Sequence, residues 1–202
     1  MVEPRECAGV VLAGGYSRRM GRDKAALPHP AGGTLLDRQL ACLAAAGVAR
    51  RLVSLRHDQP APPLPADVTI VRDDGASGPL GGIIAALRAG PAPWLFVLAT
   101  DLPRFPAEGI RRLLREAGPR GAFPRHTGGD EPLAALYPLG WLPVAEAARH
   151  EKRLGLRTLL AHADSHPWLA PVPWPDAHDF ANWNHPGDLP AEIRANVVPP
   201  ST

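Results

Sequence analysis

The chain has 202 residues, close to one typical domain and long enough to bury a core without disulfides or metal. Apolar residues make up 45% and charged residues 21%, and the 25 prolines are scattered between apolar runs as in turns and caps. Lys and Arg number 22 against 20 Asp and Glu, a net charge of +2 that is too small for a surface that coats a nucleic acid. These values argue against a disordered chain and against a dedicated nucleic-acid binder.

The two cysteines, Cys7 and Cys42, lie far apart and form no Cys-x-x-Cys pair, which favours a reduced compartment. The N-terminus lacks the cationic start and long apolar core of a secretion signal. No run approaches the roughly twenty apolar residues of a membrane span. We therefore expect a cytoplasmic protein without a membrane partner.

The first half of the chain alternates strands with helices. The apolar run at Ala8–Ala13 predicts a strand covered on both faces, and it ends at Gly14-Gly15. Thr34, with Asp37 three places later, predicts the start of a helix that Gly47 ends. The elements expected next are strands at Arg51–Leu55 and Val68–Val71, a helix at Pro79–Arg88, a strand at Trp94–Ala99 and a helix at Ala107–Ala117.

Beyond Gly121 the pattern is looser. The segments expected there are strands at Ala122–Arg125 and Leu133–Tyr137 and helices at Val144–His150 and Leu156–Ala163. Pro167–Pro175 is too rich in proline for a helix or a central strand and is expected to be a connector or an edge. The alternation predicts an α/β fold: a single-domain, Rossmann-like, mostly parallel sheet with helices on both faces and one antiparallel strand. We expect the domain to span residues 1–195, with 196–202 as a flexible tail.

A glycine-rich and then basic loop follows the first predicted strand. Two glycines at the carboxyl end of a buried strand let the backbone approach a ligand, and N–H groups there can hold phosphate oxygens. Residues 18–24 contain four cations and one acid, and Lys24 is one of only two lysines in the chain. This concentration of charge suits a polyphosphate. The loop lacks the Gly-Lys-Ser/Thr ending of a Walker A loop and the Gly-x-Gly-x-x-Gly spacing of a dinucleotide fingerprint.

Aspartates follow two other predicted strands. Asp101 follows the apolar strand at Trp94–Ala99, so its carboxylate emerges at the carboxyl edge of the sheet, where open α/β sheets bind ligands. Mg²⁺ commonly takes one or two carboxylates together with phosphates and waters, and Asp101 suits that role. The alternative is an ordinary turn or helix-capping aspartate before Pro103. Asp73 and Asp74 are expected at the same edge.

Amides and histidines complete the set of candidate ligands. Asn182 and Asn184 flank Trp183, and in an extended segment both amides point the same way, so that they can donate to and accept from one heterocycle. The alternative is a pair of turn asparagines. His162 and His166 lie four residues apart without a third ligand nearby, which argues against zinc.

The stretch from Leu12 to Lys24, LAGGYSRRMGRDK, resembles the N-terminal motif of the molybdenum cofactor guanylyltransferases. Three later segments resemble the same family in the same order: Gly78-Pro79-Leu80-Gly81-Gly82-Ile83, then Asp101-Leu102-Pro103, then Asn182-Trp183-Asn184 with Pro186. The resemblance covers residues 8 to about 190. It implies a nucleotidyltransferase fold and a Mg²⁺-dependent transfer of GMP from GTP to Mo-molybdopterin, which forms molybdopterin guanine dinucleotide and pyrophosphate.

The resemblance also implies roles for individual residues and partners. Asp101, Lys24 and Arg19 would act in catalysis, with Asp101 as the Mg²⁺ ligand, and Asn182 and Asn184 would hold molybdopterin. Residues expected to contact GTP are Leu12, Ala13, Gly14, Gly15, Lys24, Ser54, Asp73, Pro79, Leu80 and Asp101. Molybdenum insertion proteins and molybdoenzyme chaperones are expected as protein partners. The chain departs from the family at two positions, Ser54 in place of a frequent Asn and His185 in place of a frequent Thr.

Two alternatives stay open at this point. The first is a cytidylyltransferase of the same fold that acts on molybdopterin or an isoprenoid precursor. Its first motif would resemble Leu-Ala-Ala-Gly, so Gly14 favours guanine. The second is a non-catalytic protein that binds the molybdenum cofactor or a nucleotide. Such a protein would tolerate loss of Asp101 or Lys24, yet both are present.

Overall fold

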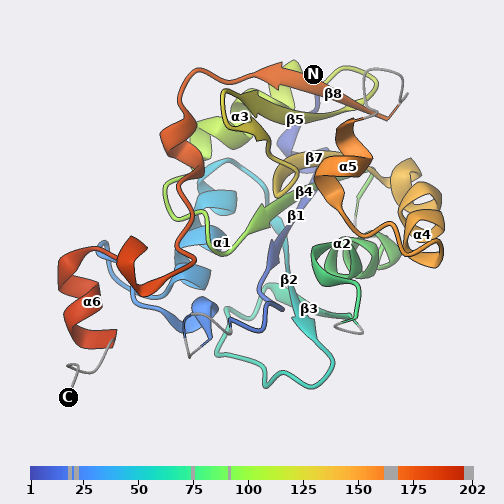
Figure 1. Cartoon of the computed structure of the whole chain (residues 1–202). Coiled ribbons are helices and arrows are strands. Elements are labelled where there is room, and N and C mark those ends of the chain that lie inside the picture. The colour runs from blue at the N-terminus through green and yellow to red at the C-terminus, as the bar shows by residue number, and fades with distance from the viewer. Residues whose placement is uncertain (18–19, 21–22, 74–75, 91, 162–167, 198–202) are drawn as a thin grey trace.

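The computed structural model describes residues 1–17, 20, 23–73, 76–90, 92–161 and 168–197. These described residues form one sheet with helices on both faces, which confirms the predicted α/β fold (Figure 1). The strands are β1 (Cys7–Leu12), β2 (Arg50–Arg56), β3 (Val68–Asp73), β4 (Trp94–Ala99), β5 (Gly121–His126), β6 (Gly129–Asp130), β7 (Ala134–Pro138) and β8 (Leu169–Pro173). The α-helices are α1 (Leu35–Ala45), α2 (Gly78–Arg88), α3 (Ala107–Glu116), α4 (Leu142–His150), α5 (Leu156–Ala161) and α6 (Ala191–Val197).

The strand order is β3-β2-β1-β4-β7-β5-β6, and β8 pairs with β5. Strands β1 to β4 are mutually parallel, and β7 runs antiparallel to both β4 and β5. The sequence predicted one antiparallel strand, whereas the described residues form two, because β6 also pairs antiparallel with β5. This second strand has only two residues, Gly129 (φ +117°) and Asp130, directly after the turn at Thr127-Gly128, and it is too short to show an alternating pattern in the sequence.

The proline-rich segment after residue 167 forms the edge strand β8, which pairs only with β5 among the described residues. An edge position agrees with the prediction, since proline cannot donate to a neighbouring strand. At the C-terminal end, α6 runs to Val197, two residues into the range expected to be a tail. Residues 198–202 lie outside the described residues.

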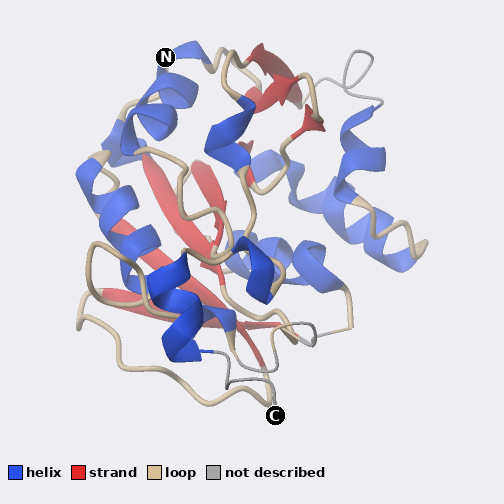
Figure 2. Cartoon of the chain, turned by 60° about the vertical axis from the view of Figure 1, so that its left-hand side comes forward, coloured by secondary structure: helices blue, strands red, loops and turns tan. Residues whose placement is uncertain are grey.

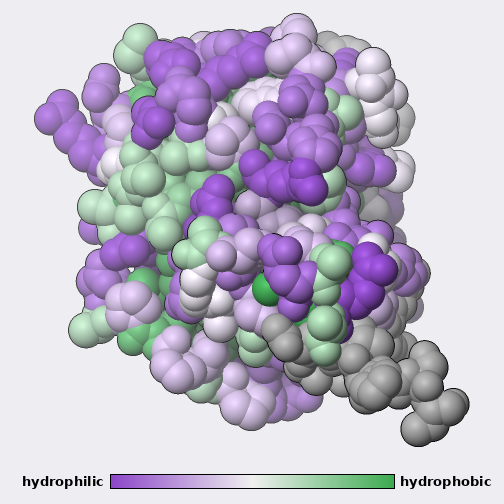
Figure 3. Space-filling view, turned by 90° about the vertical axis from the view of Figure 1, so that its left-hand side faces the viewer, coloured by the Kyte–Doolittle hydropathy of each residue, from purple (hydrophilic) through white to green (hydrophobic). Residues whose placement is uncertain are grey.

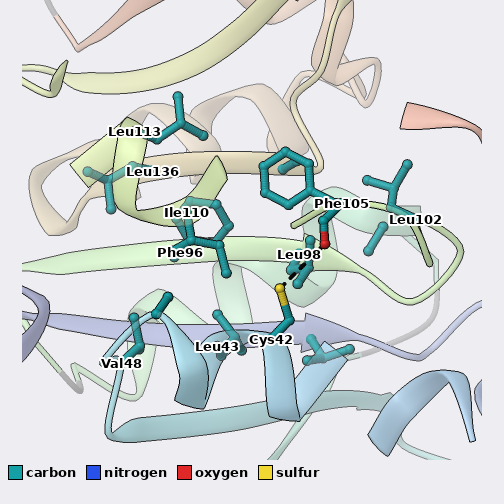
Figure 4. Close-up of a cluster of buried hydrophobic side chains, with 14 of the residues drawn as sticks. Cys42, Leu43, Val48, Phe96, Leu98, Leu102, Phe105, Ile110, Leu113 and Leu136 are labelled. Carbon is teal, nitrogen blue, oxygen red and sulfur yellow. Dashed lines mark hydrogen bonds between the residues drawn. The ribbon is translucent and has the colours of Figure 1, made fainter. Parts of the chain in front are cut away.

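Alternate residues of the central strands pack on opposite faces of the sheet. On β4, Phe96 and Leu98 join a cluster with α1 and α3, whereas Leu95 and Val97 join a cluster with α2, α4 and α5. Figure 4 shows the first cluster, and Figure 1 shows the two groups of helices on the two sides of the sheet. Burial on both faces explains why these strands carry continuous apolar runs. At Gly9, an added Cβ would lie 2.6 Å from Leu43 Cδ2, so a glycine is needed for α1 to pack this closely.

The helix α1 begins as the sequence predicted. The Thr34 hydroxyl accepts a hydrogen bond from the Asp37 N–H at 3.1 Å, and Asp37 Oδ2 accepts one from the Thr34 N–H at 2.9 Å. Gly47 follows the helix with φ +87°, a conformation that favours glycine. The capping box and the glycine therefore set both ends of α1.

A third, smaller cluster attaches the C-terminal segment to the start of α1, on the side that comes forward in Figure 2. Its buried members are Met20, Leu27, Leu35, Trp183, Leu189 and Ile193. The outer surface drawn in Figure 3 mixes hydrophilic residues with weakly hydrophobic ones. None of the helices that the structure describes combines the length and apolarity needed to cross a bilayer.

Candidate functional site

Two adjoining cavities lie at the carboxyl ends of β1 and β4, with volumes of about 320 and 470 Å³. The residues that line both are Pro79, Ala99, Asp101 and Leu133. Among the described residues, three large hydrophobic side chains are exposed, and two of them line these cavities: Tyr16 the first and Leu154 the second. The four shared lining residues make the two cavities continuous along one edge of the sheet. The two cavities therefore form one candidate site with two compartments.

The loop after β1 is held from the carboxyl end of β2. The Arg56 guanidinium donates to the carbonyl oxygens of Gly14 and Gly15 at 2.8 and 3.2 Å and lies 4.2 Å from the centre of the Tyr16 ring. Gln59 Nε2 donates to the Ala13 carbonyl at 3.1 Å. Within the described part of the chain, the N–H groups of Gly14 and Gly15 donate no hydrogen bond. These N–H groups are available to an anion in the first cavity.

A short helix at Lys24–Ala26 orients the lysine of this loop. The Lys24 N–H donates to Ser17 Oγ at 3.1 Å, and Asp23 caps the helix by accepting from the Ala25 N–H at 2.9 Å. Asp23 Oδ2 also accepts from Gln59 Nε2 at 2.9 Å. The backbone that carries Lys24 is thus bonded on both sides.

Lys24 lines the first cavity and connects two segments that are remote in sequence. Its Nζ donates to Asp101 Oδ2 at 3.2 Å and to Asn184 Oδ1 at 2.6 Å. The side chains of Lys24 and Asp101 are 19% and 24% exposed, so solvent screens this ion pair only in part. No described residue donates a hydrogen bond to Asp101 Oδ1. That oxygen is available to a metal ion or a ligand.

The loop that carries Asp101 is held by three neighbours. Gln39 is fully buried on α1, and its Nε2 donates to the carbonyls of Ala99 and Leu102 at 3.1 and 2.7 Å. Thr100 Oγ1 donates to the Leu12 carbonyl at 2.7 Å. The Trp183 N–H donates to the Asp101 carbonyl at 3.1 Å. Asp101 is therefore anchored to α1, to β1 and to the C-terminal segment.

The segment with the two asparagines is held by Asp188. The Asp188 carboxylate accepts from the N–H groups of His185 and Asn184 at 2.7 and 2.8 Å, and these bonds hold the pKa of Asp188 below its usual value. Buried Trp183 anchors the segment in the third cluster. Asn182 is exposed and lines the second cavity with Asn184.

Ser54, on β2, and Asp73, at the end of β3, also line the first cavity. Ser54 is buried, and its Oγ donates to Asp73 Oδ2 at 3.1 Å. A Cβ added to Gly14 would lie 3.4 Å from Asp73 Oδ2, and one added to Gly82 would lie 2.7 Å from Ser54 Oγ. Gly82 is therefore needed for close packing against Ser54, whereas the tightest contact of a Cβ at Gly14 would be 3.3 Å to the Arg56 backbone nitrogen.

Comparison with known proteins gives consistent matches to a family model and to a curated relative. The model of the MobA-like NTP transferase domain family matches residues 9–167. An Opitutus terrae protein named "Probable molybdenum cofactor guanylyltransferase" is 38% identical over 198 residues, which cover 94% of this chain and 96% of the relative. The chain belongs to the MobA-like NTP transferase domain family. It is accordingly a nucleotidyltransferase, as the motifs from Leu12 to Asn184 predicted.

Solved structures agree on the fold. The molybdopterin-guanine dinucleotide biosynthesis protein A of Archaeoglobus fulgidus superposes with a TM-score of 0.68 at 23% identity and covers 90% of this chain and 94% of its own. The 2-C-methyl-D-erythritol 4-phosphate cytidylyltransferase of Thermus thermophilus gives 0.66 at 19% identity, with 89% and 93% coverage. The fold is therefore shared by transferases of different substrates and does not by itself choose between the bases.

In this member of the MobA-like family, most of the predicted site residues meet at the two cavities. The first cavity is lined by Leu12, Ala13, Gly14, Gly15, Lys24, Ser54, Asp73, Pro79 and Asp101, and the second by Asn182 and Asn184. Leu80 is an exception: its side chain is fully buried in the core under α2 and lines neither cavity. The α-helix that begins at Gly78 turns Leu80 toward the sheet. Arg19, Asp74, His162 and His166 lie outside the described residues.

Among the residues that hold the site, Gln39, Arg56, Gln59, Thr100 and Asp188 were not predicted. Arg56 and Gln59 follow the second strand, so their position at the carboxyl edge was a usable signal. Gln39 carries no such signal, because it lies inside an otherwise apolar helix face. Across the described residues, no group of three His, Cys, Asp or Glu side chains is arranged to hold a metal. A divalent ion at Asp101 would therefore need oxygen ligands from a phosphate or water, as Mg²⁺ accepts.

Proposed function

We propose that this protein transfers GMP from GTP to the terminal phosphate of Mo-molybdopterin and releases pyrophosphate. The observation that carries the proposal is the position of Lys24, which lines the first cavity and contacts both Asp101, a residue of both cavities, and Asn184, a residue of the second. A cation between two compartments can act on a donor in one and an acceptor in the other. The name of the Opitutus terrae relative supports molybdopterin as the acceptor and guanine as the base.

The donor nucleotide would occupy the first cavity. The N–H groups of Gly14 and Gly15, which donate no hydrogen bond within the described residues, suit the oxygens of a triphosphate, and the Lys24 ammonium adds a compact positive charge. The Asp73 carboxylate, oriented by Ser54, would accept hydrogen bonds from the nucleoside. Arg19 is proposed to assist with the phosphates.

The acceptor would occupy the second cavity with its phosphate near Lys24. A phosphate oxygen of the acceptor forms a bond to the α-phosphorus of GTP, while the bond from that phosphorus to the oxygen of the pyrophosphate breaks. The electron pair of the broken bond leaves with pyrophosphate. The acceptor phosphate is already ionised, so no general base is needed. The protein therefore contributes positioning and charge neutralisation, with Lys24 placed to stabilise charge in the transition state.

Mg²⁺ is proposed to bind at Asp101, whose Oδ1 accepts no hydrogen bond from the described residues. When bound, the ion would neutralise phosphate charge and help to align the two substrates. A single carboxylate suffices for this ion when phosphates supply further oxygens. Asp101 would keep the ion beside Lys24, where donor and acceptor meet.

The test is a direct assay of the product. The purified protein is incubated with Mg²⁺, molybdopterin carrying molybdenum, and labelled GTP or labelled CTP, and the dinucleotide is identified by mass. We expect the guanine dinucleotide together with one equivalent of pyrophosphate. A cytosine dinucleotide would establish the cytidylyltransferase alternative, which shares this fold. Binding of GTP without any dinucleotide would establish the non-catalytic alternative.

A further inference from the structure

The second cavity contains a buried carboxylate that the transfer chemistry does not use. Glu131 lies between β6 and β7 and lines this cavity only, whereas Asp101 lines both. Its residue exposure is 7%. Removing a carboxylate from water is costly unless hydrogen-bond donors surround it. The positions of the hydrogen-bond donors around Glu131 therefore show which of its two oxygens is left to bind a ligand.

Two side chains bind one oxygen of Glu131. His126 Nδ1 accepts from the Gly128 N–H at 2.9 Å, so in the neutral ring the proton is on Nε2, which donates to Glu131 Oε1 at 3.1 Å. Arg157 Nη2 donates to the same oxygen at 3.0 Å. The His126 ring stacks on Phe180, with centroids 4.8 Å apart and planes 7° from parallel. The carboxylate is thus fixed in place from one side.

The other oxygen, Oε2, accepts no hydrogen bond from any residue that the structure describes. A carboxylate oxygen has two acceptor sites, and because Glu131 lines the second cavity, an Oε2 without a donor from the described residues favours a ligand that brings N–H donors. It also repels a phosphate or another anion. Lys24 lines the first cavity and contacts Asp101 and Asn184, which line the second, so its positive charge lies at the junction of the two cavities and attracts an acceptor phosphate there.

We propose that Glu131 Oε2 accepts hydrogen bonds from the amino and ring N–H groups of the acceptor's heterocycle, while the acceptor phosphate lies beside Lys24. This inference rests on the proposed function and adds a determinant of acceptor specificity to it. The 2-amino-4-oxopyrimidine edge of a pterin carries adjacent N–H donors of this kind. A 2,4-dioxo edge replaces the amino donor with a carbonyl acceptor, which Oε2 would repel. The residue thus selects the acceptor by its donor pattern.

A pair of ligands that differ at that edge tests the proposal. The probes are 6-hydroxymethylpterin and 6-hydroxymethyllumazine, measured by equilibrium dialysis against the whole protein in the presence of GTP. Hydrogen bonds to a charged group are among the stronger ones, so we expect the pterin to bind at least about tenfold more tightly. Equal affinities, or no binding of the pterin, would overturn the proposal.

Glu131→Gln should reduce the preference to about twofold or reverse it, because the amide keeps the shape of the side chain but loses its charge. The matched control is Glu146→Gln, which alters an arginine-paired glutamate on α4 that lines neither cavity and should keep the full preference. GTP affinity serves as the test that Glu131→Gln is folded. If that variant does not fold, the comparison of the two ligands on the unaltered protein still decides.

The two proposals can fail separately. If no dinucleotide forms but the unaltered protein prefers the pterin through Glu131, the proposed function is wrong and the assignment of Glu131 stands. If the dinucleotide forms and Glu131→Gln keeps the preference for pterin, the assignment of Glu131 is wrong and the proposed function stands.

Discussion

Replacing Gln39 by methionine tests whether a buried amide on α1 positions the loop that carries Asp101. Gln39 Nε2 donates to the carbonyls that flank this loop, at 3.1 Å to Ala99 and 2.7 Å to Leu102. Its Oε1 is buried and has no hydrogen-bond partner among the described residues. Methionine is similar in length and flexible enough to fill the same space, but it donates no hydrogen bond.

The cost can be worked out from these contacts. Loss of two hydrogen bonds costs about 2 kcal/mol, and neither carbonyl is left bare, because Ala99 O still accepts from the Leu102 N–H and Leu102 O from the Phe105 N–H. Removing the unpartnered Oε1 recovers roughly 1 kcal/mol. We therefore expect a net loss of about 1 kcal/mol. For a chain of this size that corresponds to a fall in Tm of about 2–4 °C.

Activity should fall by more than this stability change explains. At temperatures where the variant is fully folded, a displacement of the Asp101 loop by a fraction of an ångström should lower kcat about tenfold and change the KM for GTP less. Thermal unfolding followed by circular dichroism and steady-state assays with GTP provide the two measurements. The control is Leu113→Met, a volume-conserving change in the cluster that α1 and α3 form with the sheet. This change should lower Tm slightly without lowering kcat. A normal kcat in folded Gln39→Met would refute the positioning role.

Four further substitutions probe the site directly. Asp101→Asn keeps the shape but removes the charge that would hold Mg²⁺, so the rate at saturating Mg²⁺ should fall about 100-fold or more, and a rate near that of the unaltered protein would contradict the metal assignment. Gly14→Ala places a Cβ 3.4 Å from Asp73 Oδ2, and in competition assays GTP use should fall more than CTP use; equal losses would mean that Gly14 does not select the base. Asn182→Ala should raise only the concentration of molybdopterin that the reaction requires, and calorimetry should find its GTP affinity nearly intact; a clear loss of GTP affinity would assign Asn182 to the donor. Asn184→Ala should also slow transfer, because the Asn184 side chain contacts Lys24.

The sequence by itself determined the elements and the edge of the sheet where the site lies. Local patterns sufficed for this, because a strand buried on both faces requires a continuous apolar run such as Trp94–Ala99, which matches β4 in both bounds. The capping box of Thr34 and Asp37 likewise acts within four residues. Because parallel strands expose their carboxyl ends at one edge, the loop at Gly14 and the aspartate at Asp101 were predicted to lie together.

Only the tertiary structure decided which side chains meet there. Lys24 and Asn184 are 160 residues apart in the chain, and their contact depends on Trp183 packing into the third cluster, which no local pattern encodes. Leu80 was assigned to the nucleotide by its motif, yet the rotation of α2 against the sheet buries its side chain. Gln39 looks like a misplaced polar residue on an apolar helix face until the fold brings the Asp101 loop against it. The direction of a side chain depends on how helices and loops dock, and docking is set by contacts distant in sequence.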